Sequence, residues 1–316
     1  MAVPTNTLQT YQSGNNAEDV TDIIMNISPV DTPLLTLAKR SKAEATYTQW
    51  PIESLSAVDS TNANIEGDDA TVDASSTPTL VGNYTQLVDK VASVTTTQNA
   101  IHKYGVSDEM AKQMAKKGKE LKRDMESIML LNQARVVGAA ATAQKMRSMG
   151  SWLTTNTARG ATGASGSATA AATDGTQRAF TEALFKTVLV ACATNANDMP
   201  TLVMAGPANR ANLSSQLSGT STRYYELKDG DLNASISVYR SDYGPLKFVM
   251  NRFQRERDMW FLNPDYVKIR TLEPMQTVDL ARTGLTEKKQ VWTNFTLEVS
   301  NEAAHGVLAD LLTAVI

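Results

Sequence analysis

Apolar residues near the N-terminus fall at helical spacing ahead of a proline. They occupy positions i, i+3, i+4 and i+7 of one helix face, namely Val20, Ile23, Ile24 and Ile27. Pro29 ends this helix, because proline lacks a backbone donor and disfavours the helical conformation of the residue before it. Such a stripe would be exposed on an isolated chain, so it predicts a segment that packs against another surface.

A second short helix is predicted directly after the first. Pro33 suits the first helical position, and Asp31 or Thr32 can cap the helix from the preceding turn. Lys39 and Arg40 lie where positive charge complements the carboxyl end of a helix. The two helices and the proline joint between them predict an amphipathic N-terminal arm.

A polar stretch between two strand-like segments follows the arm. Residues 46–50 favour a short strand that stops at Pro51, and residues 79–97, rich in Val, Thr and Tyr, favour a long one. Residues 54–78 between them contain few large apolar side chains and cannot bury a core of their own. The chain is expected to run out along a polar route and return along a strand, as a projecting β-loop.

The longest helical pattern starts at Ser107, a suitable N-cap, and continues without proline to about Val137. Its apolar positions recur at spacings of three, four and seven: Met110, Met114, Leu121, Met125 and Ile128. A helix of about thirty residues would be about 45 Å long at 1.5 Å per residue. That length is unusual for a globular domain, in which a helix averages about 11–12 residues.

The second half of the chain mixes helical and strand-like segments. Residues 154–176 are a low-complexity run of Gly, Ala, Ser and Thr, which predicts a flexible loop. Helices are expected at 181–194 and from Gly206 to Leu217, strands at 201–205, 259–262 and 266–270, and a hairpin over 235–250 with its turn at 242–245. The clearest strand is 290–300, with one face formed by Val291, Phe295, Leu297 and Val299.

Composition excludes several classes of protein. The chain has 316 residues, enough for one large domain or two, and a formal charge of −3, which demands no polyanionic or polycationic partner. One cysteine, Cys192, rules out an intrachain disulfide, and its helical surroundings favour a buried small side chain over a reactive thiol. The N-terminus lacks the pattern of a signal peptide, and no stretch is apolar enough to span a membrane. Synthesis in a reducing cytoplasm fits these features.

No catalytic or cofactor site emerges from the residue pattern. His102 and His305 are distant in sequence, and no spacing of Cys, His or carboxylates matches a known metal motif. The Gly-rich stretch at 160–166 lacks the preceding strand and the Lys-Ser/Thr pair of a phosphate-binding loop. We therefore expect no enzyme, no metal centre and no cofactor.

One acidic cluster allows more than one interpretation. Glu66, Asp68 and Asp69 surround a glycine and could bind a divalent cation, form a solvated loop, or meet basic residues of a neighbouring subunit. Basic and acidic residues alternate on the long helix, with Lys112, Lys116, Lys117, Lys119, Lys122 and Arg123 against Asp108, Glu109, Glu120, Asp124 and Glu126. This charge pattern allows three interpretations: a solvated helix face with internal ion pairs, a surface that faces DNA, or a surface that pairs with the acidic cluster of another subunit.

Several phrases, in order along the chain, resemble one protein family. They are NNAEDVTDIIMNISPVDTPLLTLAKR at 15–40, IEGDDA at 65–70, VGNYTQ at 81–86, KKGKELKRDME at 116–126, TDGTQRAFTEAL at 173–184, VYRSDYGPLKFVMNRF at 238–253 and TLEVSNEAAHGV at 296–307. The chain resembles a branch of tailed-phage major capsid proteins with the Hong Kong 97 type shell fold, a branch long known only as a domain of unknown function. Residues 154–176 do not align.

The resemblance implies an α+β capsid fold with an N-terminal arm, an extended β-loop, a long spine helix and a mixed α/β axial domain. The implied divisions are the arm at 1–45, the extended β-loop at 46–97, a peripheral domain with the spine helix and flexible loop at 98–180, an interleaved axial domain at 181–285, and a C-terminal strand returning to the peripheral domain at 286–316.

The implied function is self-assembly, as pentamers and hexamers, into the icosahedral head of a tailed bacteriophage. The head would enclose double-stranded DNA without sequence-specific binding, and the chain would be made in the host bacterial cytoplasm and end in the virion. Portal, decoration and separate scaffolding proteins are the further implied partners. The subunit interface is expected to include Val20, Ile23, Ile24, Ile27, Glu66, Asp68 and Asp69. An encapsulin-like compartment, which encloses cargo enzymes, is the alternative.

Overall fold

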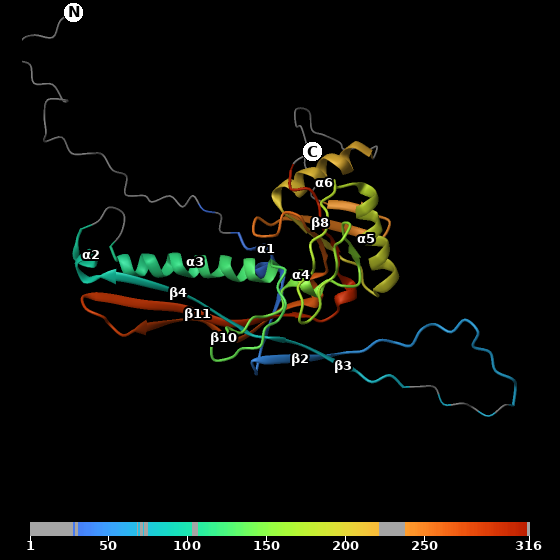
Figure 1. Cartoon of the computed structure of the whole chain (residues 1–316), viewed down its shortest axis with the longest axis horizontal. Helices are drawn as coiled ribbons and strands as arrows, with labels where there is room; N and C mark the ends of the chain where they lie inside the picture. The colour runs from blue at the N-terminus through green and yellow to red at the C-terminus, as the bar shows by residue number, and fades with distance from the viewer. Residues whose placement is uncertain are drawn as a thin grey trace, which may run out of the picture.

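The structure is a computed structural model that describes residues 28, 31–67, 69, 72, 75–102, 107–220 and 238–314. A long helix lies along a four-stranded sheet, and a six-stranded sheet with two helices forms a second body above one end of it (Figure 1). A two-stranded ribbon carries a loop away from both bodies. This mixture of helices and sheets agrees with the predicted α+β class.

The four-stranded sheet joins segments from the whole length of the chain. Its order is β1 (Lys39–Lys42), β10 (Val267–Leu280), β11 (Thr286–Val299) and β4 (Gln86–Thr95). β11 pairs antiparallel with both β10 and β4, while β1 runs parallel to β10. The predicted apolar face of β11 is buried: Val291, Phe295, Leu297 and Val299. β10 and β11 are longer than the sequence pattern predicts, because both continue beyond the buried core, where β10 is largely exposed and β11 is half-buried and still paired with β4.

The spine helix α3 (Glu109–Leu130) covers one face of this sheet. Asp108, rather than Ser107, is its N-cap and accepts the N–H groups of Met110 and Ala111. The helix ends seven residues before the predicted end, so its 22 residues span about 33 Å at 1.5 Å per residue. It ends there because a later segment takes its last carbonyls: Ser148 Oγ donates to the Ile128 oxygen and the Gly150 N–H to the Leu131 oxygen.

The base of the N-terminal arm belongs to the folded body. α1 (Pro33–Leu37) starts with the predicted proline, and Leu34 and Leu35 are buried in the same core as α3. No side chain of Asp31 or Thr32 caps it, contrary to the prediction. Lys39 and Arg40 do not end this helix either: they begin β1, because the chain turns into a parallel pairing with β10.

The β-loop departs from the prediction at both of its strands. β2 (Tyr47–Ile52) continues through Pro51. Proline has no N–H to donate, and an edge strand tolerates this because one of its sides needs no hydrogen-bonding partner. The predicted strand at 79–97 is two strands, β3 (Thr79–Tyr84) and β4, which belong to different sheets. The break is at Thr85, whose N–H donates to the Thr46 oxygen.

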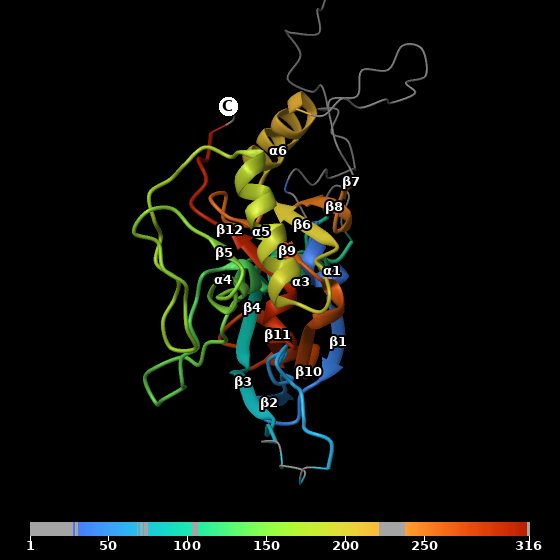
Figure 2. The ribbon, with the colours of Figure 1, turned by 90° about the vertical axis from the view of Figure 1, so that its right-hand side faces the viewer.

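The second body is a six-stranded sheet packed against α5 and α6 (Figure 2). Its strand order is β5 (Thr157–Ala158), β12 (Gly306–Leu308), β9 (Met259–Leu262), β6 (Leu202–Ala205), β8 (Gly244–Met250) and β7 (Val238–Ser241). The helices are α5 (Glu182–Asn195) and α6 (Pro207–Thr220). These elements follow the predicted ones closely, and the hairpin turn uses Gly244 with φ +128°. Short elements complete the chain: α2 (Thr96–Ala100), α4 (Met149–Trp152) and 3₁₀ turns at Pro264–Tyr266 and Glu302–Ala304.

The low-complexity segment 154–176 is organised, contrary to the prediction of a flexible loop. Asp310 holds it from the far end of the chain, because its carboxylate accepts the N–H groups of Gly160 and Gly175 at 2.9 and 2.8 Å. Arg257 donates to the same carboxylate at 2.6 Å. These hydrogen bonds keep the pKa of Asp310 below its usual value despite burial, which alone would raise it.

His305 is completely buried where the second body meets the turn after β9. Its Nδ1 accepts the Asn263 N–H at 3.1 Å, so the ring hydrogen is on Nε2. Burial lowers the pKa of His305 to about 3. The folded protein therefore binds this proton less tightly than the unfolded chain, in which the pKa is near 6.5.

We predict that His305 contributes to acid sensitivity. Between about pH 6.5 and pH 3 the unfolded state is favoured as pH falls, with a slope of up to about 1.4 kcal/mol per pH unit from this residue. His305→Gln keeps an acceptor for the Asn263 N–H but does not titrate. Its free energy of unfolding, measured by denaturant titration across this range, should fall less steeply than that of the wild type. Parallel pH profiles would contradict the assignment.

Candidate subunit interface

The structure places only part of the predicted interface. The arm residues Val20, Ile23, Ile24 and Ile27 lie outside the described residues, as does Asp68. Glu66 and Asp69 are exposed on the extended loop at 53–78, which joins β2 to β3. The described parts of this loop extend away from both bodies, on the side of the molecule opposite the N-terminal end of α3 (Figure 1).

Aliphatic side chains on the extended loop face solvent. Leu55 and Val58 are 97% and 96% exposed, and Ile65 and Val72 are also largely exposed. Single exposed aliphatic residues are common on protein surfaces, but these four lie on one loop that projects from the body. Contact with another molecule would remove them from water.

The extended loop is strongly acidic. Between residues 53 and 78 the sequence contains no Lys or Arg and six carboxylates: Glu53, Asp59, Glu66, Asp68, Asp69 and Asp73. Three of these six form the acidic cluster identified in the sequence, and the other three add further negative charge along the same loop. Like charges on one segment repel one another, so a basic surface would stabilise the loop in one position.

A basic surface of matching kind lies on α3. Lys116, Lys119 and Lys122, which we call the lysine row, are exposed on the helix. In the described part of the chain, none of their ammonium groups forms an ion pair. The row and the extended loop of one subunit lie apart along its longest axis, so they do not meet within one chain (Figure 1).

The remaining charges of α3 are partly paired within the subunit. Lys117 contacts Glu120 at 2.8 Å, and Asp124 contacts Lys90 of β4 at 2.7 Å. The Asp124 hydrogen bond raises the pKa of Lys90 above its usual value. Internal ion pairs were one of the interpretations of this helix, and they account for one side of it but leave the lysine row unpaired.

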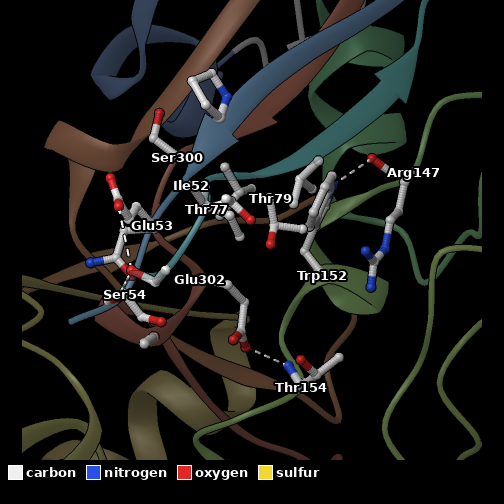
Figure 3. Close-up of a pocket in the computed structure, with 16 residues that line it drawn as sticks. Ile52, Glu53, Ser54, Thr77, Thr79, Arg147, Trp152, Thr154, Ser300 and Glu302 are labelled. Carbon is white, nitrogen blue, oxygen red and sulfur yellow. Dashed lines mark hydrogen bonds between the residues drawn. The ribbon is translucent and has the colours of Figure 1, made fainter. Parts of the chain in front are cut away.

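A cavity of about 680 Å³ opens at the base of the extended loop, and we call it the root pocket (Figure 3). It lies between the ends of β2 and β3 and the segment after α4. Its walls include Ile52, Thr79, Trp152, Thr154 and Glu302. The Arg147 guanidinium lies 4.1 Å from the centre of the Trp152 ring, and burial lowers the pKa of Arg147 to about 10.

The polar groups of the root pocket serve the fold. The Glu302 carboxylate accepts the N–H groups of Thr154 and Thr155 at 2.6 and 2.9 Å, and Arg147 donates to Ser151. One hydroxyl of the lining meets a carboxylate, because Ser76 Oγ donates to Glu53 Oε1 at 3.5 Å, but this bond is long and both residues are exposed.

The predicted chemical roles of other residues can be placed as well. Cys192 is fully buried and burial raises the pKa of its thiol to about 12, which confirms the interpretation of a buried small side chain. Within the described segments no group of three His, Cys, Asp or Glu side chains is arranged to hold a metal ion. Among the helices of those segments, none combines the length and apolar character needed to cross a bilayer.

Comparison with known proteins gives the family. A profile of the family described as SU10 major capsid protein matches residues 3–312. The chain belongs to the SU10 major capsid protein family. A curated relative, the "Major capsid protein" of Escherichia phage Phieco32, is 38% identical over 136 residues. That match covers 43% of this chain and 38% of the relative's length.

Solved structures of shell proteins share the fold of this SU10-family chain. The cyanophage A-1(L) capsid asymmetric unit has a TM-score of 0.64 at 13% identity, and the capsid of a native GTA particle has 0.61 at 10% identity. Each covers 96% of this chain and 98% of the compared chain. The SrpI encapsulin of Synechococcus elongatus reaches 0.55 at 12% identity, covering 94% of this chain and 93% of its own. The predicted Hong Kong 97 type capsid fold is confirmed.

Proposed function

We propose that this chain self-assembles as pentamers and hexamers into the icosahedral head of a tailed phage. Family membership supports the proposal, together with a fold shared with capsid subunits over nearly the whole chain. The observation that carries it is the projecting extended loop, whose aliphatic side chains are exposed and whose charged residues are all acidic. Contact with another copy would bury these aliphatic side chains.

The extended loop of one subunit docks on the lysine row of its neighbour in this proposal. The charges are opposite, each group is exposed, and both occur once in every subunit, so the contact can repeat around a ring. Opposite charges steer encounter and fix register more than they add affinity. The aliphatic residues of the loop then supply the buried apolar area.

The head would enclose double-stranded DNA without sequence-specific binding, since the net charge of −3 gives the subunit no basic excess to hold a polyanion. The chain would be made in the host cytoplasm and become part of the virion. Portal, decoration and separate scaffolding proteins are its proposed partners. The proposal assigns no catalytic role and no cofactor.

An encapsulin-like compartment is the second candidate, favoured only by the similarity of fold to the SrpI encapsulin. A phage head and an encapsulin-like compartment differ in what they enclose. Particles isolated from their natural source should contain double-stranded DNA. A nuclease should digest this DNA only after the particles have been opened. Particles that contain a protein cargo and no nucleic acid would favour the compartment.

Electron microscopy of the purified chain, at increasing concentration and with co-expressed scaffold candidates, tests the proposal as a whole. Closed hollow polyhedra, or sheets and tubes of hexamers, are the expected products. Small discrete particles under every condition, scaffolds included, would reject a shell function.

Charge reversal on the lysine row should weaken assembly. We predict that Lys119→Glu raises the concentration needed for shell formation several-fold, because it places like charges across the interface. Salt screens the repulsion between like charges, so at high salt the variant and the wild type should need more similar concentrations for shell formation. Lys247→Glu is the matched control, since Lys247 is also exposed but lies on β8. Light scattering during assembly measures both.

Reversing the charges of the extended loop should also weaken assembly. Reversing the charges of the lysine row in a second subunit should restore it. The triple variant Glu66→Lys, Asp68→Lys and Asp69→Lys is predicted to assemble poorly alone and better when mixed with a Lys116→Glu, Lys119→Glu, Lys122→Glu subunit. If loop reversal leaves assembly unchanged at every ionic strength, the cluster is a solvated loop.

Removal of the arm should separate folding from assembly. Deleting residues 1–30 leaves α1 and β1 in place, so we expect a chain with unchanged thermal unfolding that forms no closed shells. Deleting residues 1–40 also removes the buried Leu34 and Leu35, so the unfolding temperature should fall as well. Normal shells from the shorter deletion would show that the apolar stripe of the arm is not an interface.

A further inference from the structure

Glu126 carries a carboxylate into the interior of the subunit. The residue is on α3 and has no exposed surface. One oxygen, Oε1, accepts the Leu34 N–H at 2.8 Å, and the other, Oε2, accepts the Leu35 N–H at 2.7 Å. Both donors belong to α1, at the base of the N-terminal arm, 92 and 91 residues away in sequence.

These two N–H groups would otherwise have no partner. The first N–H groups of any helix lack an acceptor within the helix, and α1 has no side-chain cap of its own. A helix of five residues does not form in isolation, since helices shorter than about 12–15 residues are marginal in water. The position of α1 therefore depends on what it contacts, and the Glu126 carboxylate accepts two of its N–H groups.

Glu126 also connects α1 to the second body. Asn251, which directly follows β8, donates from Nδ2 to Glu126 Oε1 at 2.6 Å. The Asn251 N–H in turn donates to the Ala205 oxygen at the end of β6. One carboxylate thus joins the spine helix, the base of the arm and the six-stranded sheet.

No charged side chain pairs with Glu126 among the described residues. α1 carries no charged side chain. On α3, Asp124 pairs with Lys90, and the Arg123 guanidinium lies 5.4 Å from the centre of the Phe253 ring. Arg252, next to Asn251, makes no ion pair in the described part of the chain. Hydrogen bonds alone hold the carboxylate, and burial raises its pKa above the usual value.

We propose that Glu126 is the positioning residue of the N-terminal arm: it fixes the base of the arm to the spine helix and the second body, and so sets where the chain enters α1. Any effect on contact with a neighbouring subunit rests on the proposed shell function. The anchor itself is a property of the isolated subunit and can be tested there.

The contacts with α1 favour the ionised form of Glu126. Burial raises the pKa of this carboxyl, whereas the hydrogen bonds from the Leu34 and Leu35 N–H groups lower it. A protonated carboxyl would place its O–H against one of these two donors, so the anchor needs a carboxylate whose two oxygens both accept.

The test measures the anchor on unassembled subunits. In the wild type, residue-resolved hydrogen exchange should show the Leu34 and Leu35 amides protected at least about tenfold more than free helix N-termini. Chymotrypsin should cleave slowly after these leucines, which are 2% and 7% exposed. Glu126→Gln places an amide donor against one of the two N–H groups, so cleavage there should become at least about tenfold faster.

Glu120→Gln is the matched control, since it makes the same change on the same helix at a residue paired with Lys117. It should cleave like the wild type. If Glu126→Gln does not fold, Asn251→Ala removes one donor only and should give a smaller increase in cleavage. Unprotected Leu34 and Leu35 amides in the wild type, or equal cleavage in the two Gln variants, would overturn the proposal. Either result would leave shell formation by the wild type unaffected, so the two proposals fail separately.

Discussion

Carboxylates of buried or half-buried residues that accept backbone N–H groups hold the parts of this subunit that have little structure of their own. Glu126 does this for α1, Asp310 for the loop at 154–176, and Glu302 for the turn after α4. A buried carboxylate is costly unless its oxygens are hydrogen-bonded, and each of these accepts at least two donors. Because such segments cannot bury a core, the body must position them, and these carboxylates are where it does so.

Local pattern predicted the elements, and distant contacts decided where they end. The apolar face of α3 and the alternation of β11 are periodic signals that packing preserves. The early end of α3 depends on Ser148, 20 residues from the carbonyl it contacts. The order of segment 154–176 depends on Asp310, at the far end of the chain, so its composition alone indicated flexibility. In the sequence, Glu126 looks the same as Glu120 on the same helix, and only the fold shows which is buried.

The sequence predicted the acidic part of the candidate interface but not all the residues that belong to it. The sequence pattern identified three carboxylates on a loop whose charged residues are all acidic, and the structure shows that this loop projects and carries exposed aliphatic side chains. The lysine row emerges only when Lys117 is seen to pair with Glu120, leaving Lys116, Lys119 and Lys122 without ion pairs in the described chain. In the proposed assembly, this chain of the SU10 major capsid protein family therefore carries an acidic loop and a lysine row that meet only between copies.

Cryo-electron microscopy of the assembled particle, at a resolution that shows side chains, tests this account most directly. The account predicts that the extended loop of each subunit lies over α3 of a neighbour, with its carboxylates within about 4 Å of the lysine row, the usual limit for an ion pair. An extended loop that lies away from α3 of every neighbour, in a well-ordered shell, would contradict it.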